Sequence, residues 1–281
     1  MTLFINYNGK LVEETTPVVS AGNRGLRFGD GLFETIKMLE GEIKLFDFHM
    51  DRMFAGLTLL HFEIPVHFTK DILKEEVTKL CRKNQVEKAA RIRLNIFRGN
   101  GGLFDPENLK PNFLIEASPL PDNYLRLNEN GLLVGVYPDA LKSCDILANY
   151  KTNNYLPYVM AAFYAKHHRL NDCFVLNQHY RICDTTIANV FWVKEDVIFT
   201  TPLSEGCVAG VMRRNLLEKM PKAGYILKEE ILSNANLENA GEIFLTNAAY
   251  GLRWVRQFKS TNYSNLLTQK IYKEFLQPKD R

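Results

Sequence analysis

Apolar and polar residues alternate in several short stretches of the first half of the chain, a pattern that predicts β-strands. Leu3, Ile5 and Tyr7 alternate and are followed by Asn8-Gly9, so residues 3–13 are predicted as a hairpin with a two-residue turn. Further strands are predicted at 33–38, 91–98 and 112–118, and apolar residues at helical spacing predict helices over 46–62 and 69–84. In the second helix, Ile72, Leu73, Val77 and Leu80 are expected to point inward.

The second half of the chain mixes strands and helices in the same way. Strands are predicted at 131–138, 173–177, 181–183, 189–193 and 196–200, and a strand, a turn and a second strand over 242–255. Helices are predicted at 156–169 and at 263–276. A third helix is predicted within 206–220, where a glycine loop leads into it. The expected class is α+β in two domains, 1–117 and 125–281, joined by the proline-containing linker 118–124.

One lysine stands at the boundary between a loop and a predicted helix. Lys151 lies in ANYKTNNYLPYVMA, residues 148–161, and Pro157 suits a first helical turn because it lacks an N–H group. The following apolar residues are expected to form a buried face: Val159, Met160, Phe163 and Tyr164. A lysine next to apolar sequence can have a lowered pKa and attack carbonyl groups, including the aldehyde of pyridoxal 5′-phosphate (PLP). Taken alone, a solvated surface lysine is the more common explanation.

Composition and charge exclude several other classes of protein. The chain has 281 residues, of which 46% are hydrophobic and 24% charged, as in ordinary globular proteins. Its net charge of +3 favours neither a nucleic acid nor a membrane partner. The N-terminal residues do not have the pattern of a signal peptide. Five scattered cysteines without a paired motif predict neither a metal site nor a disulfide framework, and fit the reducing cytoplasm.

Three features together could hold a phosphorylated cofactor. The glycine loop 206–210 opens a helix, where free N–H groups and the helix dipole favour an anion. Arg52 follows His49 by three residues on a predicted helix and could bind phosphate. Asp184, in CDTTIANVFW, could keep a pyridine nitrogen protonated. Each feature alone is more often a turn, a surface arginine or a capping aspartate.

The order of these motifs resembles that of the fold-type IV PLP-dependent enzymes, the aminotransferase class IV family. The matching segments are FGDGLFETIK at 28–37, LFDFHMDRM at 45–53, LANYKTNNYLP at 147–157, CDTTIANVFWV at 183–193, TTP at 200–202 and CVAGVMR at 207–213. The family includes branched-chain aminotransferases, D-amino-acid aminotransferases and 4-amino-4-deoxychorismate lyases. The resemblance implies a small α/β domain and a larger barrel-like domain with PLP between them, in a homodimer.

The resemblance also implies roles for individual residues. Lys151 would bind PLP covalently and transfer protons, while Arg52 and the backbone amides of Val211 and Met212 would hold the phosphate. Asp184 would face the pyridine nitrogen, at a position where the family usually has glutamate. Tyr155 is a further candidate near the cofactor.

Two short motifs bear on the reaction itself. Aminotransferases of this family usually place threonine, after glycine or serine, at the cofactor-binding position where this chain has Ala248 after Asn247. The Asn-Ala pair resembles the lyases, as does RGNGG at 98–102, which makes Arg98 a candidate substrate residue. Glu34, in GLFET, is a second candidate substrate residue and is also common in aminotransferases.

The expected function is therefore a lyase that converts 4-amino-4-deoxychorismate to 4-aminobenzoate and pyruvate in folate synthesis. The main alternative is an aminotransferase that acts on branched-chain or D-amino acids with a 2-oxo acid acceptor. A non-enzymatic alternative is a PLP-binding relative with little turnover, or a binding module for another phosphorylated ligand. Any of these would have a small-molecule partner.

Overall fold

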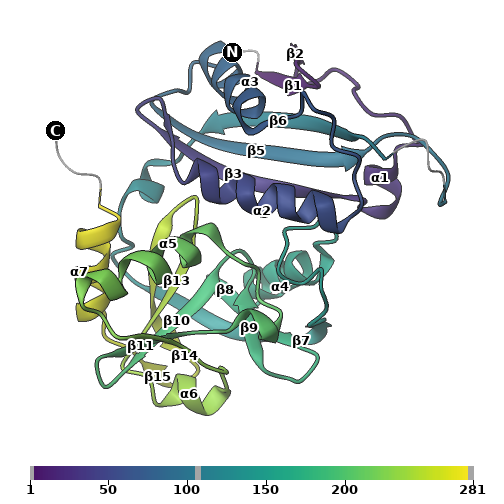
Figure 1. Cartoon of the computed structure of the whole chain (residues 1–281). Coiled ribbons are helices and arrows are strands. Elements are labelled where there is room, and N and C mark those ends of the chain that lie inside the picture. The colour runs from purple at the N-terminus through teal and green to yellow at the C-terminus, as the bar shows by residue number, and fades with distance from the viewer. Residues whose placement is uncertain (1–2, 105–108, 278–281) are drawn as a thin grey trace. The chain divides into compact units, whose positions relative to one another are not determined.

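The computed structural model describes residues 3–104 and 109–277, which divide into two compact units (Figure 1). The first unit consists of the chain up to Leu120 together with Tyr150–Asn154. The second consists of Pro121–Asn149 and the chain from Tyr155 onward. The short segment that carries Lys151 thus packs with the first unit, whereas sequence analysis placed it in the second domain.

The first unit is built on an antiparallel six-stranded sheet with the order β2-β1-β6-β5-β3-β4 (Figure 1). Its strands are β1 (Phe4–Tyr7), β2 (Lys10–Glu13), β3 (Gly31–Leu39), β4 (Glu42–Ile43), β5 (Ala89–Arg98) and β6 (Pro111–Pro119). Asn8 and Gly9, between β1 and β2, both have positive φ angles, of 50° and 84°. The predicted hairpin with a two-residue turn is therefore confirmed.

Two helices pack on one face of this sheet, α2 (Phe46–Leu59) and α3 (Lys70–Lys83). Their buried residues, such as Met50 and Leu73, share one core with Ile36 of β3 and Ile92 of β5. Because side chains alternate along a strand, Glu34 of β3 points to the same face as Ile36 and therefore toward α2. The list of inward residues in α3 was wrong at one position, since 42% of Ile72 is exposed.

A short helix, α1 (Arg24–Phe28), was not predicted. The Asn23 side chain accepts a hydrogen bond from the Leu26 N–H, and the helix ends at Gly29, whose φ of 63° is left-handed. The sequence between Asn23 and Gly29 is too short for helical periodicity to appear, although both capping residues are typical of helix ends.

The second unit contains a mixed nine-stranded sheet in which β12-β11-β10-β13-β14-β7-β8-β9 follow one another and β15 pairs with β14. Its strands are β7 (Leu132–Lys142), β8 (Asp172–Asn177), β9 (Ile182–Thr185), β10 (Asn189–Lys194), β11 (Val197–Thr200), β12 (Leu227–Glu229), β13 (Glu242–Asn247), β14 (Gly251–Phe258) and β15 (Thr261–Asn262). β7 is parallel to both of its neighbours, β14 and β8, whereas β13 is antiparallel to both of its neighbours, β10 and β14.

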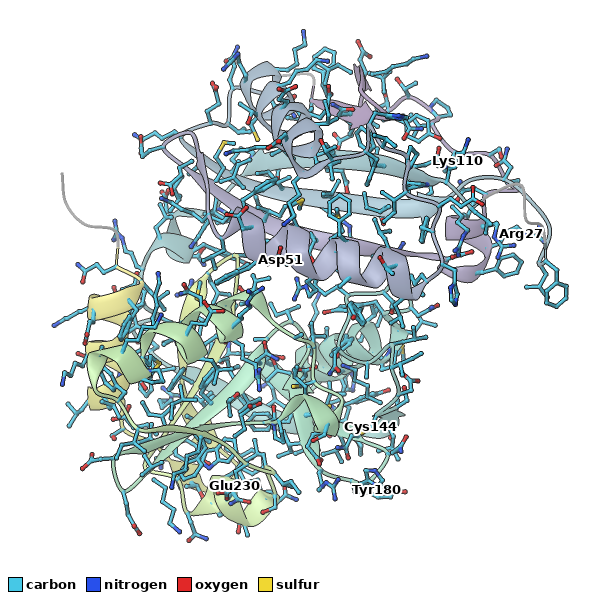
Figure 2. All side chains as sticks on the ribbon, viewed as in Figure 1. Arg27, Asp51, Lys110, Cys144, Tyr180 and Glu230 are labelled. Atoms are coloured by element: carbon cyan, nitrogen blue, oxygen red, sulfur yellow. The ribbon has the colours of Figure 1, made fainter. Side chains whose placement is uncertain are left out.

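The helices of the second unit are α4 (Leu156–His167), α5 (Val211–Lys219), α6 (Asn234–Glu238) and α7 (Leu266–Phe275). Three short 3₁₀ turns add to them: η2 (Asp122–Leu125), η3 (Leu203–Glu205) and η4 (Pro221–Ala223). The tight β8–β9 hairpin carries Tyr180, whose φ is 57° and whose exposed side chain is labelled in Figure 2. This mixture of strands and helices in both units confirms the predicted α+β class.

The predicted buried face of α4 was wrong at three of its four positions, since Tyr164 alone is partly buried and packs against the core. Val159, Met160 and Phe163 are 39%, 46% and 62% exposed, and the buried residues of the helix are Tyr158, Ala161 and Ala165. These three pack with Cys173 and Val175 of β8. Because α4 is apolar around most of its circumference, periodicity alone could not show which side faces the sheet.

Within the described residues, the five cysteines are free thiols and no cluster of His, Cys, Asp or Glu is arranged to hold a metal ion. The helices in that part of the chain are all too short or too polar to cross a bilayer.

Candidate active site

Lys151 lies on a short segment that pairs with β3. The Phe33 N–H donates to the Lys151 carbonyl at 2.8 Å, and the Asn153 N–H donates to the Gly31 carbonyl at 3.0 Å. A β-bridge between Leu32 and Thr152 lies between these two bonds. The Lys151 Nζ atom is 4.4 Å from the centroid of the Phe33 ring, a cation–π contact. The lysine is therefore fixed by backbone pairing to a strand.

Two glycines of the FGDGL motif allow this close approach. A Cβ atom on Gly31 would lie 2.7 Å from Asn153 Nδ2 and 2.2 Å from the Ile96 carbonyl oxygen. A Cβ atom on Gly29 would lie 2.5 Å from Asn154 Oδ1, and the φ of Gly29 is 63°. The glycines thus make room for the segment that carries Lys151.

Arg52 is held by a buried carboxylate in the same unit. Arg52 Nε donates to Glu34 Oε1 at 2.8 Å, and Arg52 Nη2 donates to Oε2 at 2.5 Å. His49, one turn earlier on α2, places Nδ1 2.7 Å from Glu34 Oε2. The side chains of Glu34, Arg52 and His49 are 3%, 8% and 0% exposed. Glu34 therefore positions Arg52 through a two-point ion pair.

The charges in this cluster follow from its burial and its contacts. Burial alone would raise the pKa of Glu34, but the charge of Arg52 and the hydrogen bonds from His49 and Arg52 outweigh it, and the pKa falls to about 2. Burial lowers the pKa of His49, against the opposing effect of Glu34. At neutral pH a neutral His49 donates its Nδ1 proton to Glu34. His49 Nε2 is buried and makes no hydrogen bond to the described residues.

Arg98, predicted as a substrate residue, is 8% exposed and makes several contacts within the first unit. Its Nη1 donates to Asp30 Oδ1 at 2.5 Å, its Nη2 donates to the Leu60 carbonyl, and its guanidinium lies 4.2 Å from the Phe62 ring centroid. Arg24 binds the other oxygen of Asp30 at 2.9 Å. These contacts connect α1, α2 and β5, so Arg98 has a structural role in addition to any contact with substrate.

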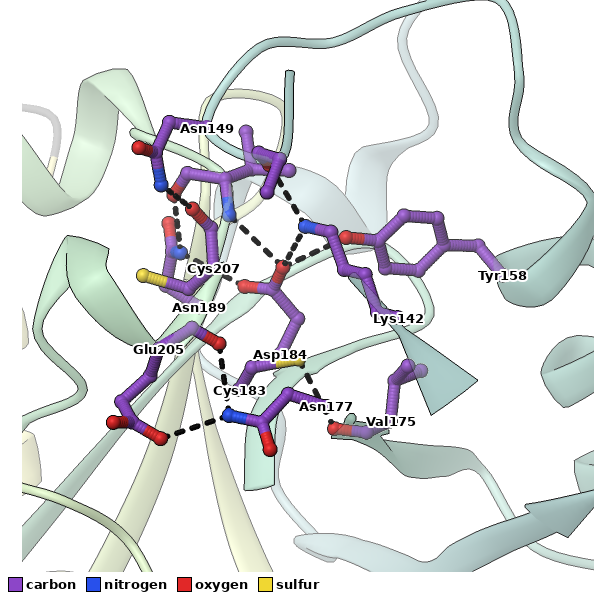
Figure 3. A network of polar contacts seen from close by, with 12 residues as sticks. Lys142, Asn149, Tyr158, Val175, Asn177, Cys183, Asp184, Asn189, Glu205 and Cys207 are labelled. Atoms are coloured by element: carbon purple, nitrogen blue, oxygen red, sulfur yellow. Dashed lines mark hydrogen bonds and ion pairs between the residues drawn. The ribbon is translucent and has the colours of Figure 1, made fainter. Parts of the chain in front are cut away.

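Asp184 is the centre of a buried polar network in the second unit (Figure 3). Its Oδ2 atom accepts hydrogen bonds from the Tyr158 hydroxyl at 2.8 Å, the Val208 N–H at 2.9 Å and Lys142 Nζ at 3.2 Å. Its Oδ1 atom accepts one hydrogen bond, from Asn189 Nδ2 at 3.0 Å. Asp184 is 2% exposed.

This distribution of donors leaves one acceptor position on Asp184. A carboxylate offers about two lone-pair sites on each oxygen. Three donors share Oδ2, whereas Oδ1 has a single donor, so Oδ1 can accept one further hydrogen bond from a bound ligand. Burial raises the pKa of Asp184, and Lys142, Val208 and Tyr158 oppose this shift.

The first turn of α5 presents the backbone amides of Val211 and Met212. The residue before the helix, Gly210, has no side chain that could cap them, and a Cβ atom there would lie 1.9 Å from Asn189 Oδ1. Asn189 also donates to the Val208 carbonyl at 2.8 Å. Asp184, Asn189 and Val208 therefore fix the loop that leads into this helix, and uncapped N–H groups at a helix start favour an anion.

The remaining predicted residues lie on turns of the second unit. Asn247 Oδ1 accepts hydrogen bonds from the N–H groups of Ala249 and Tyr250, both at 3.0 Å, and so closes the turn between β13 and β14. Ala248 lies within that turn. Tyr155 donates to the Thr186 carbonyl at 3.3 Å, and its ring stacks on that of Tyr158 at 4.4 Å.

Sequence reasoning missed Lys142, Asn189 and Tyr158. Asn189 lies inside the CDTTIANVFW motif, five residues after Asp184, and could have been singled out there. Lys142 is 42 residues before Asp184 in the chain. A lysine at the end of a predicted strand has no sequence feature that would indicate a contact with Asp184. Tyr158 lies within the predicted helix 156–169, where helical spacing gives no sign that its hydroxyl donates to Asp184.

The residues present fit PLP. Arg52 is a preorganised cation, the start of α5 suits a phosphate, and Asp184 Oδ1 can accept a hydrogen bond from a protonated pyridine nitrogen. Lys151 supplies the amine. Arg52 and Lys151 belong to the first unit, whereas Asp184 and the start of α5 belong to the second. The contacts described above hold each of these groups in place within its own unit.

Comparison with known proteins gives the class of the fold. The structure superposes on a branched-chain aminotransferase from Thermoproteus uzoniensis with a TM-score of 0.87 at 23% identity, covering 98% of this chain and 94% of that one. A hypothetical aminotransferase from Mycobacterium tuberculosis, solved in a PLP-bound form, gives a TM-score of 0.83 at 18% identity, covering 97% and 96%. The predicted fold-type IV architecture, a half-barrel sheet and a smaller sheet, is confirmed.

Curated relatives carry two kinds of name. An aminodeoxychorismate lyase from Vibrio harveyi is 32% identical over 83% of this chain and 85% of its own length. Another protein of that name from Bacillus subtilis is 30% identical over 93% and 88%. A putative branched-chain-amino-acid aminotransferase from Methanocaldococcus jannaschii is 31% identical over 87% and 84%.

The family model for amino-transferase class IV matches residues 31–258, and the chain belongs to this family. The resemblance found in the sequence motifs is confirmed. PLP is accordingly the expected cofactor.

Proposed function

We propose that this chain is a PLP-dependent lyase that converts 4-amino-4-deoxychorismate to 4-aminobenzoate and pyruvate, a reaction of folate synthesis. The observation that carries the choice is the Asn247 turn. Its amide oxygen accepts two backbone N–H groups, and Ala248 follows without a hydroxyl, at the position where aminotransferases usually have threonine. The two lyase-named relatives support the same choice.

The proposed roles of the residues follow the sequence expectations. Arg52, held by Glu34, and the amides of Val211 and Met212 bind the phosphate, with Asn247 and Ala248 beside it. Asp184 Oδ1 accepts a hydrogen bond from the protonated ring nitrogen, and the negative charge of the carboxylate keeps that nitrogen protonated and positively charged.

Tyr155 lies next to the cofactor at the start of α4. Glu34 and Arg98 contribute to substrate recognition by holding in place the elements that contact the substrate.

When bound, PLP supplies an electron sink for a negative charge that develops at the amine-bearing carbon of the substrate. Lys151 would form the covalent attachment and, once displaced by the substrate amine, would remove the proton from that carbon. In the lyase reaction the bond between the neighbouring ring carbon and the ether oxygen would break, which makes the ring aromatic and releases enolpyruvate; enolpyruvate becomes pyruvate on taking up a proton. A general base of this kind works best when its pKa is close to the working pH.

An aminotransferase is the alternative, favoured by the relative named as a putative branched-chain aminotransferase and by Glu34, which is common in that group. The two reactions share the removal of the proton by Lys151. They differ in its destination, since Lys151 of an aminotransferase would return the proton to the cofactor rather than allow pyruvate to leave.

We also propose that the protein is a homodimer in the reducing cytoplasm. Exposed apolar side chains on α4, namely Leu156, Met160 and Phe163, support association of two copies. Unpaired buried cysteines such as Cys173 and Cys207 suit a reducing compartment. Sedimentation of the purified protein at several concentrations tests the dimer.

The test of function is incubation of the PLP-loaded protein with 4-amino-4-deoxychorismate. We expect pyruvate and 4-aminobenzoate in equal amounts. Parallel incubations with branched-chain or D-amino acids and a 2-oxo acid should give little product. Transamination without 4-aminobenzoate would favour the alternative, and an absorbance band of bound PLP without either product would indicate a binding protein with little turnover.

A further inference from the structure

Lys142 is a buried cation that the proposed reaction does not yet use. Its side chain is 10% exposed, and Nζ lies 3.2 Å from Asp184 Oδ2 (Figure 3). The same atom donates to the Ala148 carbonyl at 2.9 Å and lies 5.2 Å from the centroid of the Tyr158 ring. Lys142 therefore has a defined geometry set by three partners.

The contacts of Lys142 connect Asp184 to two loops. Ala148 precedes Asn149, whose side chain donates to the carbonyls of Cys207 and Leu203 at 2.7 and 2.9 Å. The Asn149 carbonyl in turn accepts the Ala209 N–H at 2.8 Å. The loop before the Lys151 segment and the loop before α5 are thus fixed to each other, and both are fixed to Asp184 through Lys142 and Val208.

The other ionisable groups around Asp184 do not stabilise its negative charge by a charge of their own. Tyr158 donates a neutral hydrogen bond, and burial raises the pKa of its hydroxyl well above the usual value. The neighbouring thiols of Cys183 and Cys207 are also neutral, because burial raises their pKa values, that of Cys207 to about 12. Among the described residues, Lys142 forms an ion pair with Asp184, and its charge lowers the pKa of that carboxyl against the effect of burial.

A buried carboxylate with no cation beside it would take up a proton. A protonated Asp184 could not hold a positive charge on a bound pyridine ring. The chain uses aspartate where its family usually has glutamate, and the aspartate carboxylate lies one methylene closer to its own backbone.

We propose that Lys142 is a positioning residue for Asp184: its ammonium group keeps Asp184 ionised and holds Oδ2, which leaves Oδ1 to accept a hydrogen bond from the protonated ring nitrogen of the cofactor. This role rests on the proposed PLP chemistry, but the ionisation of Asp184 can be measured without cofactor or substrate.

The first experiment follows the carboxylic acid C=O stretch by infrared difference spectroscopy during a pH titration of the cofactor-free protein. The band of Asp184 is identified by its loss in Asp184→Asn. In Lys142→Met we expect Asp184 to protonate at a pH about 1–3 units higher than in the parent. Lys142→Arg should restore the parent titration. Unshifted titration in Lys142→Met would overturn the proposal.

Lys259→Met is the matched control. Lys259 also pairs with a carboxylate, Glu238 at 3.4 Å, and lies 5.2 Å from the ring of Phe258, but its side chain is 57% exposed. Removal of this lysine should leave the Asp184 band unchanged. A shift of similar size in the control would mean that the effect is not specific to Lys142, and would also overturn the proposal.

A second experiment measures the protonation of the cofactor ring nitrogen by nuclear magnetic resonance, with ¹⁵N-labelled PLP bound to the protein. The ring nitrogen resonance of Lys142→Met should move toward that of the unprotonated ring. In an Asp184→Asn background the same substitution should cause no further change, because Lys142 acts through Asp184. An additional change of equal size in that background would contradict the proposal.

Should Lys142→Met fail to fold, the double variant with Asp184→Asn decides the question. Restored folding supports the pair, and continued unfolding means that Lys142 has a separate role. If the infrared result holds but 4-amino-4-deoxychorismate is not cleaved, the proposed function fails while the Lys142–Asp184 relationship stands.

Discussion

Glu34 and Arg52 form a buried two-point ion pair between β3 and α2, with N–O distances of 2.8 and 2.5 Å. The strand alternation that points Glu34 toward α2 and the spacing that puts His49 and Arg52 on one side of that helix are both local properties of the sequence. The pair itself is a tertiary contact, which joins two motifs 18 residues apart.

Acidification should lower the free energy of unfolding, because Glu34 becomes protonated and loses its ion pair with Arg52. Because its pKa falls from 4.5 to about 2 in the folded state, its stabilising contribution is complete above pH 4.5 and is lost as the pH falls toward 2. The contribution is about 3 kcal/mol. Urea unfolding of the parent and of Glu34→Gln across this range measures it. The variant should be less stable at neutral pH and lose less on acidification; equal acid dependence in both proteins would contradict the prediction.

Arg52→Ala should lower both stability and PLP affinity. Stability falls by about 3–5 kcal/mol because Glu34 is left as a buried, unpaired charge. PLP affinity falls by about 1.5–3 kcal/mol because a charge-assisted hydrogen bond to the phosphate is lost. Absorbance titration with PLP measures the affinity. Arg82→Ala, which breaks the exposed pair with Glu87, should change neither quantity. Unchanged affinity in Arg52→Ala would remove Arg52 from the phosphate site.

Lys151→Ala should abolish the covalent PLP adduct that borohydride traps in the parent, since the amine that binds the aldehyde is gone. Peptide mass spectrometry identifies the labelled residue. The backbone pairing of residue 151 with Phe33 does not need the side chain, so the unfolding free energy should change little. An adduct on another lysine of the variant would refute the assignment.

Substitutions of Asp184 should separate charge from size. Asp184→Asn removes the charge and replaces one of the two oxygens by an NH2 group, which cannot accept the hydrogen bonds that this oxygen accepted. Turnover should therefore fall sharply while PLP still binds. Asp184→Glu keeps the charge at a packing cost of about 1–3 kcal/mol in this enclosed site. Turnover of the three proteins at saturating PLP is the measurement, and parent-like turnover of the asparagine variant would show that the charge is not used.

Gly210→Ala should destabilise the loop that opens α5. The added Cβ atom would lie 1.9 Å from Asn189 Oδ1, so Asn189 must move away from Asp184 and Val208. Gly241→Ala is the control, because the nearest atom to its Cβ is the Val193 carbonyl oxygen at an ordinary 3.8 Å. Thermal unfolding and PLP affinity should fall in the first variant alone, and equal effects in both would contradict this account.

The sequence predicted most strands and helices because alternation and helical spacing are local signals. It did not predict α1, which is too short to show a period, or the buried side of α4, where apolar residues surround the helix. The motifs located Lys151, Arg52 and Asp184 along the chain. They could not show that Glu34 binds Arg52 or that Lys142 binds Asp184, because these contacts depend on tertiary structure between distant segments.

The pairing of Tyr150–Asn154 with β3 has a consequence for recombination between related genes. The chain passes from the second unit to the first and back within five residues, so neither unit corresponds to one continuous stretch of coding sequence. A gene fusion that exchanges everything after Leu120 would bring a foreign lysine segment against the recipient's Gly29, Gly31 and Phe33. Chimeras of this kind should function only when the lysine segment of one parent can pair with the β3 strand of the other. The segment that carries the nucleophile must therefore be inherited together with the strand that holds it.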